Sequence, residues 1–330
     1  MSLSRRHFVT SSLYASVGLL ASRRSVWGSA RALLTSRERV ARALAGQDVD
    51  RPALTLWHHF GLESKGPAAH AAATLAFHRA NGTDLVKVMS DFPFPRPAGE
   101  WFSVREQATP FPAQLDALRR IASGLQGGAP FVETIFNPWN VAEKLSSPEA
   151  VQQLRHEQPQ RLIDALEAIA RSEANHARQA VAAGADGIFL AIANAQPQIL
   201  SPTDYARFSE PFDRLVLDAV RDARLNVLHL HGDGVYLDRF SSGWPATAIN
   251  YSAHGTHVPL REIRRRFAGV LIGGIDETHY RTLDVAALRA QATDAASEAG
   301  ARFVLAPGCS VPNEATAEEL GRLRRVYASS

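Results

Sequence analysis

Three side chains that could bind one metal ion stand at the ends of two apolar segments. His229 and His231 lie near the end of residues 226–233, N-V-L-H-L-H-G-D, and Cys309, the only cysteine, follows residues 302–306. Residues two apart on a strand point the same way, so both imidazoles are expected on one side. Imidazole and thiolate are ligands of transition metals, usually zinc. The alternative is two hydrogen-bonded histidines and a buried thiol that bind no metal.

The elements that would position these side chains are predicted to be eight strands and nine helical segments. The predicted strands are 52–58, 84–90, 130–136, 186–192, 227–231, 248–251, 270–273 and 302–306. The predicted helices are 36–44, 67–80, 112–125, 148–154, 158–183, 201–223, 260–267, 285–299 and 315–327. Near-continuous apolar strands are typical of a parallel sheet buried on both faces, and eight such units favour a single TIM (β/α)8 barrel. A doubly wound open sheet is the alternative, but no G-x-G-x-x-G follows a strand.

Functional residues of a barrel lie at the carboxyl ends of its strands, and this rule selects further candidates. Asp91, after the second strand, is the candidate catalytic residue, although a helix N-cap or an ion pair would explain it equally well. The candidates for substrate binding are His58, His59, Phe136, Asn194 and Tyr251.

Composition excludes several classes of protein. The chain has 330 residues, of which 45% are hydrophobic, and a formal net charge of +3. The chain has no basic stripe with interleaved aromatic residues, so its sequence does not indicate nucleic-acid binding. A single cysteine excludes an intrachain disulfide. Outside the N-terminus, no apolar run approaches the length of about 20 residues that a membrane span needs.

The N-terminus has the features of an export signal. Ser4, Arg5, Arg6 and Phe8 resemble the twin-arginine motif, a mildly apolar run follows at 13–21, and A-R-A at 30–32 offers a cleavage site. We therefore predict that residues 1–32 are a signal peptide, that residues 33–330 are the mature barrel, and that the protein is exported to the periplasm without a stable membrane span. The alternative is an ordinary basic N-terminus before a short helix.

Several stretches resemble the uroporphyrinogen decarboxylase superfamily. They cover nearly the whole chain after residue 32, in the family's order: R-E-R-V at 37–40, D-R-P at 50–52, M-S-D at 89–91, G-A-D at 184–186, L-S-P at 200–202, G-G-I-D at 273–276 and A-P-G-C at 306–309. The fold of that superfamily is a TIM barrel, which agrees with the independent strand count.

The decarboxylase branch of this superfamily removes acetate carboxyls from a tetrapyrrole without metal. Asp91 matches the aspartate that contacts the pyrrole N–H groups, but residues 56–61, L-W-H-H-F-G, lack the arginines that hold the carboxylates. The position of an assisting tyrosine falls near Phe136, which has no hydroxyl. Since a substrate with eight carboxylates needs cationic partners, we do not expect uroporphyrinogen to be the substrate.

The other branch contains corrinoid-linked methyltransferases, which bind zinc through His-x-Cys after the fifth strand and a cysteine after the eighth. His229 and His231 match the first element with histidine in place of cysteine, and Cys309 matches the second. The resemblance thus implies a zinc-type methyltransferase that activates a thiol or small polar acceptor, with a possible corrinoid partner. The alternatives are a metal-free decarboxylase acting through Asp91, or an exported protein that binds a tetrapyrrole or corrinoid without catalysis.

Overall fold

The structure is a computed structural model that describes residues 33–90 and 92–327. From Leu33 onward the chain forms one compact unit. The predicted signal peptide and Asp91 lie outside the described residues.

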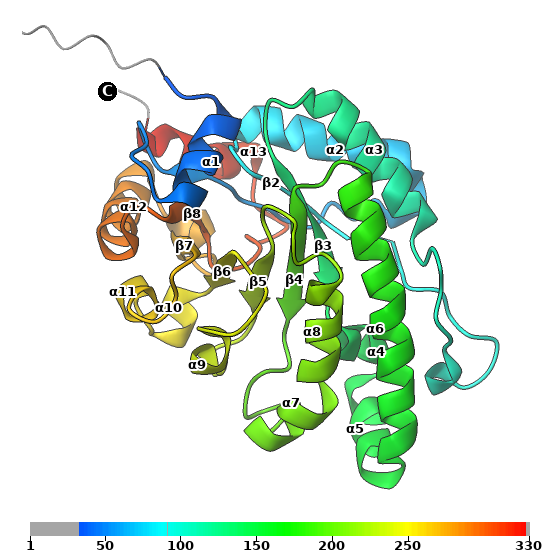
Figure 1. Ribbon diagram of the computed structural model, residues 1–330. Helices are drawn as coiled ribbons and strands as arrows, with labels where there is room; N and C mark the ends of the chain where they lie inside the picture. Colours follow the sequence, from blue (N-terminus) through cyan, green and yellow to red (C-terminus); the bar gives the residue numbers. More distant parts are fainter. Residues whose placement is uncertain (1–32, 91, 328–330) are drawn as a thin grey trace, which may run out of the picture. The chain divides into compact units, whose positions relative to one another are not determined.

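A single sheet of eight parallel strands forms the centre of this unit (Figure 1). The strands are β1 (Ala53–Leu54), β2 (Val86–Val88), β3 (Phe131–Phe136), β4 (Gly187–Ile192), β5 (Val227–Leu230), β6 (Ala248–Tyr251), β7 (Val270–Ile275) and β8 (Phe303–Pro307). Their order is β1-β8-β7-β6-β5-β4-β3-β2, and every recorded pair is parallel. This arrangement confirms the predicted TIM-like α/β barrel.

The two end strands of the sheet, β1 and β2, are joined by hydrogen bonds to the Leu54 carbonyl and the Asp84 carboxylate. The Asp84 and Leu85 amides donate to Leu54 O at 2.6 and 3.3 Å. The buried Asp84 carboxylate accepts from the Leu54 amide at 2.9 Å and pairs with Arg39 and Arg51 at 2.6 Å each. These contacts hold the ends of the curled sheet together, where the described residues form no strand ladder between β1 and β2.

Helices surround the strands on the outside (Figure 1). The main ones are α1 (Ser36–Ala45), α2 (Gly66–Asn81), α3 (Pro112–Leu125), α4 (Pro138–Leu145), α5 (Pro148–Glu157), α6 (Pro159–Ala182), α7 (Pro202–Phe208), α8 (Glu210–Asp218), α11 (Leu260–Arg264), α12 (Val285–Ala299) and α13 (Ala317–Gly321). The short helices are α9 (Leu237–Phe240) and α10 (Ala253–Thr256). Among the described residues no helix combines the length and apolarity that crossing a membrane requires.

Several helix bounds differ from the prediction. The predicted helix 201–223 is two helices, because α7 ends at Phe208 and Pro211 sits in the first turn of α8. The predicted helix 315–327 is the short α13 followed by a 3-10 turn. Helix α4 was not predicted at all. In contrast, α3 and α12 have the predicted bounds.

The barrel interior and the layer under the helices are separate apolar clusters. Val227 packs in one cluster with Phe189, Val132 and Val304, and since it shares a strand face with His229, that cluster fills the barrel. Strand residues of the opposite face pack with the helices in a larger cluster. The interior of the barrel is therefore a packed floor beneath the strand ends.

Candidate metal centre

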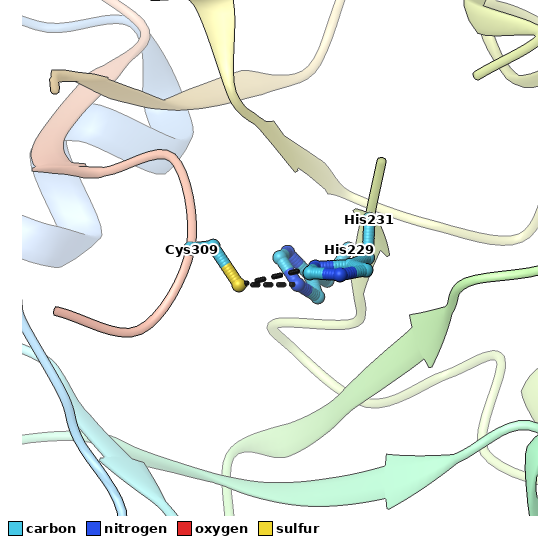
Figure 2. A group of neighbouring side chains, drawn as sticks. All are labelled: His229, His231 and Cys309. Carbon is cyan, nitrogen blue, oxygen red and sulfur yellow. Dashed lines mark hydrogen bonds between the residues drawn. The ribbon is translucent and has the colours of Figure 1, made fainter. Parts of the chain in front are cut away.

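His229, His231 and Cys309, here called the triad, come together at the carboxyl end of the barrel (Figure 2). His231 Nδ1 lies 3.3 Å from Cys309 Sγ, and His229 Nε2 lies 3.6 Å from the same sulfur. One ligand atom from each residue lies within 4.8 Å of the other two. Donor atoms bound to one zinc ion lie about 2.0–2.3 Å from it, so a small contraction of this group would place all three around one ion.

A buried asparagine fixes the orientation of His229. Asn250, in the middle of β6, donates from Nδ2 to Ile272 O at 2.9 Å and to Pro307 O at 3.2 Å. Its Oδ1 must therefore face His229 Nδ1, which donates to it at 2.6 Å. A neutral imidazole that carries its proton on Nδ1 presents the Nε2 lone pair to the triad, as metal binding requires.

Aromatic rings on the barrel floor support the same imidazole. The Phe189 ring stacks on His229 at a centroid distance of 5.0 Å, and Trp57 contacts it edge-on at 6.3 Å. Lys87 Nζ lies 4.9 Å from the Phe189 centroid and 5.3 Å from that of Trp57. The Lys87 amino group thus lies over two aromatic faces of the floor beneath the triad.

The histidines change the protonation of Cys309. Burial would raise the pKa of the thiol, but the charges and hydrogen bonds of His229 and His231 outweigh it and lower that pKa to about 4. The hydrogen bond to Cys309 in turn raises the pKa of His231. A lowered thiol pKa favours the thiolate, which is the form that binds metals.

Two glycines let the backbone approach closely at the triad. Gly232, directly after His231, has a φ of +115°, and a Cβ there would lie 2.4 Å from Gln196. A Cβ on Gly308 would lie 2.4 Å from Ser252 Cα, and the Gly308 amide donates to Glu277 Oε2 at 3.1 Å. Both glycines thus keep the neighbouring triad residues in position.

Two cavities reach the triad. A cavity of about 450 Å3, here the metal-side cavity, is lined by all three triad residues together with Trp57, Lys87 and Lys144. An outer cavity of about 730 Å3 is lined by His231, Cys309, Glu277 and Asp233. Two imidazoles and one thiolate with accessible space beside them fit catalytic zinc, which takes three protein ligands and leaves one position for substrate.

The comparisons with known proteins identify the family. Residues 100–328 match the family model "Uroporphyrinogen decarboxylase (URO-D)". The chain belongs to the uroporphyrinogen decarboxylase family. No curated protein is significantly similar to it.

Several solved structures are similar to this chain in fold. A methyltransferase from Methanosarcina mazei is 19% identical with a TM-score of 0.67, covering 89% of this chain and 98% of its own. A B12-independent methionine synthase from Shewanella sp. W3-18-1 is 14% identical with a TM-score of 0.54, covering 82% and 91%. A putative B12-independent methionine synthase from Listeria monocytogenes is 12% identical with a TM-score of 0.51, covering 83% and 94%. At these identities the similarity establishes the fold.

The cavities are lined by two of the residues that were predicted to bind substrate in this uroporphyrinogen decarboxylase family member. His59 lines both the metal-side and the outer cavity, and Phe136 lines the metal-side cavity. His58, the neighbour of His59, instead packs against the Phe60 and Phe77 rings at 5.1 Å each. Neighbouring residues of an extended chain point to opposite sides, so only one of the two histidines can face the triad.

The other two predicted substrate-binding residues lie elsewhere. Tyr251 is buried in the cluster under the helices, and its hydroxyl donates to Val258 O at 3.1 Å. Asn194 is buried and bonded to Asn137 and Ser209, both at 2.8 Å. That polar network includes Asp213, whose pKa burial raises to about 7. These placements do not support direct contact of Tyr251 or Asn194 with a substrate, and the role of Asp91 stays a prediction.

Three residues that shape the site were not among the predicted site residues. Asn250 precedes Tyr251 in β6, so the correct strand was chosen but the wrong face. Lys87 lies within the buried strand β2, and Lys144 lies on the unpredicted helix α4. Two of the chain's three lysines thus line the cavity of the triad, which was a usable signal in a chain so poor in lysine.

Proposed function

We propose that this protein is a zinc-dependent methyltransferase whose triad activates a thiol or a small polar acceptor. The observation that carries the proposal is the convergence of His229 Nε2, His231 Nδ1 and Cys309 Sγ, with Asn250 holding the first imidazole. Membership of the family supports it, as does a fold shared with structures titled methyltransferase and methionine synthase.

Each residue around the triad has a separate task in this proposal. His229, His231 and Cys309 would hold the ion, and bound zinc would lower the pKa of the acceptor's thiol or hydroxyl so that it reacts as an anion. Asn250 keeps the His229 lone pair directed at the ion. Phe189 and Trp57 exclude water from beneath it.

The described residues favour this function over tetrapyrrole decarboxylation. The metal-side cavity offers only Lys87 and Lys144 as non-histidine cations, whereas uroporphyrinogen carries eight carboxylates. We retain two alternatives as proposals: metal-free decarboxylation through Asp91, and non-catalytic binding of a tetrapyrrole or corrinoid after export to the periplasm.

Methyl transfer from methylcobalamin to 2-mercaptoethanol tests the proposal. The cobalt–carbon bond breaks with its electron pair on cobalt, a sulfur–carbon bond forms, the thiol proton passes to solvent, and the cobalamin spectrum reports the change. We expect transfer by the zinc-loaded wild type, loss of transfer in Cys309→Ser, and normal transfer in Lys65→Met, which changes an exposed side chain that lines neither cavity. Equal rates in wild type, Cys309→Ser and a no-protein control would contradict the proposal.

A further inference from the structure

A second chamber opens beside the metal-side cavity. It measures about 410 Å3 and shares His59, Thr134, Phe136 and Lys144 with the metal-side cavity. Because the two spaces have four lining residues in common, the side chamber adjoins the metal-side cavity. Each space has the size of a typical small-molecule site.

The walls of the side chamber are mainly apolar and aromatic. They come from β3, α4, α6 and the segment after β2, and comprise Phe92, Phe94, Phe111, Ile135, Phe136, Val141 and Leu145. Arg96 fastens the segment to the end of α4, since it donates to Leu145 O at 2.8 Å and to Lys144 O at 3.2 Å. Walls of this kind suit an aromatic or branched alkyl group.

Charged and polar side chains lie at defined places in this apolar chamber. Lys144 stands at the junction of the two cavities, with Nζ 2.9 Å from the centroid of the Phe136 ring. Glu173 and His176 lie on one face of α6, and each is 1% exposed. Among the described residues, Glu173 Oε2 and His176 Nδ1 have no hydrogen-bond partner.

The charge balance at the junction favours an anion. Burial raises the pKa of Glu173 well above its usual value and so disfavours a negative charge on this acid beside Lys144. Burial also raises the pKa of Glu143, which faces the metal-side cavity. Arg96 adds a second positive charge to the chamber.

We propose that the side chamber binds the tail of the methyl acceptor, and that this tail is an apolar carboxylate. Its aryl or branched alkyl group fills the chamber, and its carboxylate pairs with Lys144 at the junction. The inference rests on the proposed function for the identity of the ligand as methyl acceptor, but the chamber itself binds the tail without the metal.

Binding of 3-phenylpropionate to the purified full-length protein, measured by calorimetry, tests this proposal. We expect saturable binding, and affinity at least about tenfold weaker for the uncharged 3-phenylpropionamide, because a charge-assisted contact is lost. Lys144→Met should lower the affinity for 3-phenylpropionate by a similar factor. Lys65→Met, which removes an exposed lysine, should leave that affinity unchanged. Val141→Phe, which adds bulk to the chamber wall, should abolish binding.

The outcomes separate this proposal from the proposed function. Cys309→Ser should bind 3-phenylpropionate as well as wild type does, even if zinc never binds the triad. No saturable binding in the millimolar range, equal affinity for acid and amide, or an unchanged affinity in Lys144→Met would each overturn the chamber assignment, whatever the zinc content. If Val141→Phe does not fold, the Lys144→Met comparison alone decides.

Discussion

At the scale of single residues, we expect Asn250 to control how tightly the triad binds metal. It is the side chain that directs the His229 lone pair, and it also satisfies two backbone carbonyls. We predict that Asn250→Leu lowers zinc affinity by about 10–100-fold, because partners that orient metal ligands typically contribute that much. Competition with a chromophoric chelator measures the affinity.

The same substitution should also destabilise the metal-free protein. Ile272 O and Pro307 O would lose a buried donor, which costs about 1–3 kcal/mol of unfolding free energy. Denaturant unfolding in the presence of a chelator measures that change, and Ser310→Ala serves as the control. If Asn250→Leu binds zinc as tightly as wild type does, His229 does not need this hydrogen bond.

Lys144 gives the binding of carboxylates a characteristic pH dependence. Burial lowers the pKa of its ammonium group to about 8. The positive charge is therefore present below pH 8 and is lost as the pH rises through that value, and a bound carboxylate would move the midpoint upward. We predict that the affinity for 3-phenylpropionate falls above about pH 8. An affinity that stays constant to pH 10 would show that Lys144 does not contact the carboxylate.

At the scale of elements, the loop after β8 must approach β6 closely to deliver Cys309. Gly308 permits this approach, since a Cβ would overlap Ser252 of the segment after β6. We predict that Gly308→Ala folds but shifts the loop, lowers the unfolding free energy by about 1–3 kcal/mol and loses most of the zinc. Gly321→Ala is the matched control, because nothing lies within 4 Å of its added Cβ. Full zinc content in Gly308→Ala would mean that the loop adapts without moving Cys309.

Much of this architecture could be predicted from the sequence, because apolar strands and glycine-marked strand ends are local signals. The segment at 227–231 and the Gly308-Cys309 turn were placed correctly, so the triad could be assembled from sequence alone. Asn250 was missed because one residue decides which face of a short strand a side chain occupies. Helix α4 was missed because it has only eight residues, too few for a clear helical period.

The helix boundaries show the same limit. The helix predicted at 36–44 ends at Ala45, and its N-cap is Thr35, which forms a capping box with Glu38. The side chamber could not be predicted at all, because it depends on the Arg96 contact with α4, which joins segments 48 residues apart or more. Contacts of this kind follow from the folded barrel and leave no local pattern.

At the scale of the whole molecule, the N-terminal sequence predicts where the barrel works. Export by the twin-arginine pathway depends on recognition of Arg5 and Arg6, and lysine keeps their charge without that recognition. We predict that the double substitution Arg5→Lys and Arg6→Lys retains the protein in the cytoplasm with residues 1–32 attached. Fractionation and mass spectrometry of the N-terminus measure this outcome. Normal export of the variant would contradict the prediction of a twin-arginine signal.

The central claim is that two histidines and one cysteine from opposite parts of the barrel hold one zinc ion. X-ray absorption at the zinc edge of the purified full-length protein, together with elemental analysis, tests it most directly. We predict one zinc per chain, with one sulfur at about 2.3 Å and two imidazole nitrogens at about 2.0–2.1 Å, and loss of the sulfur signal in Cys309→Ser. Protein without stoichiometric zinc after reconstitution, or zinc without a sulfur ligand, would contradict the claim.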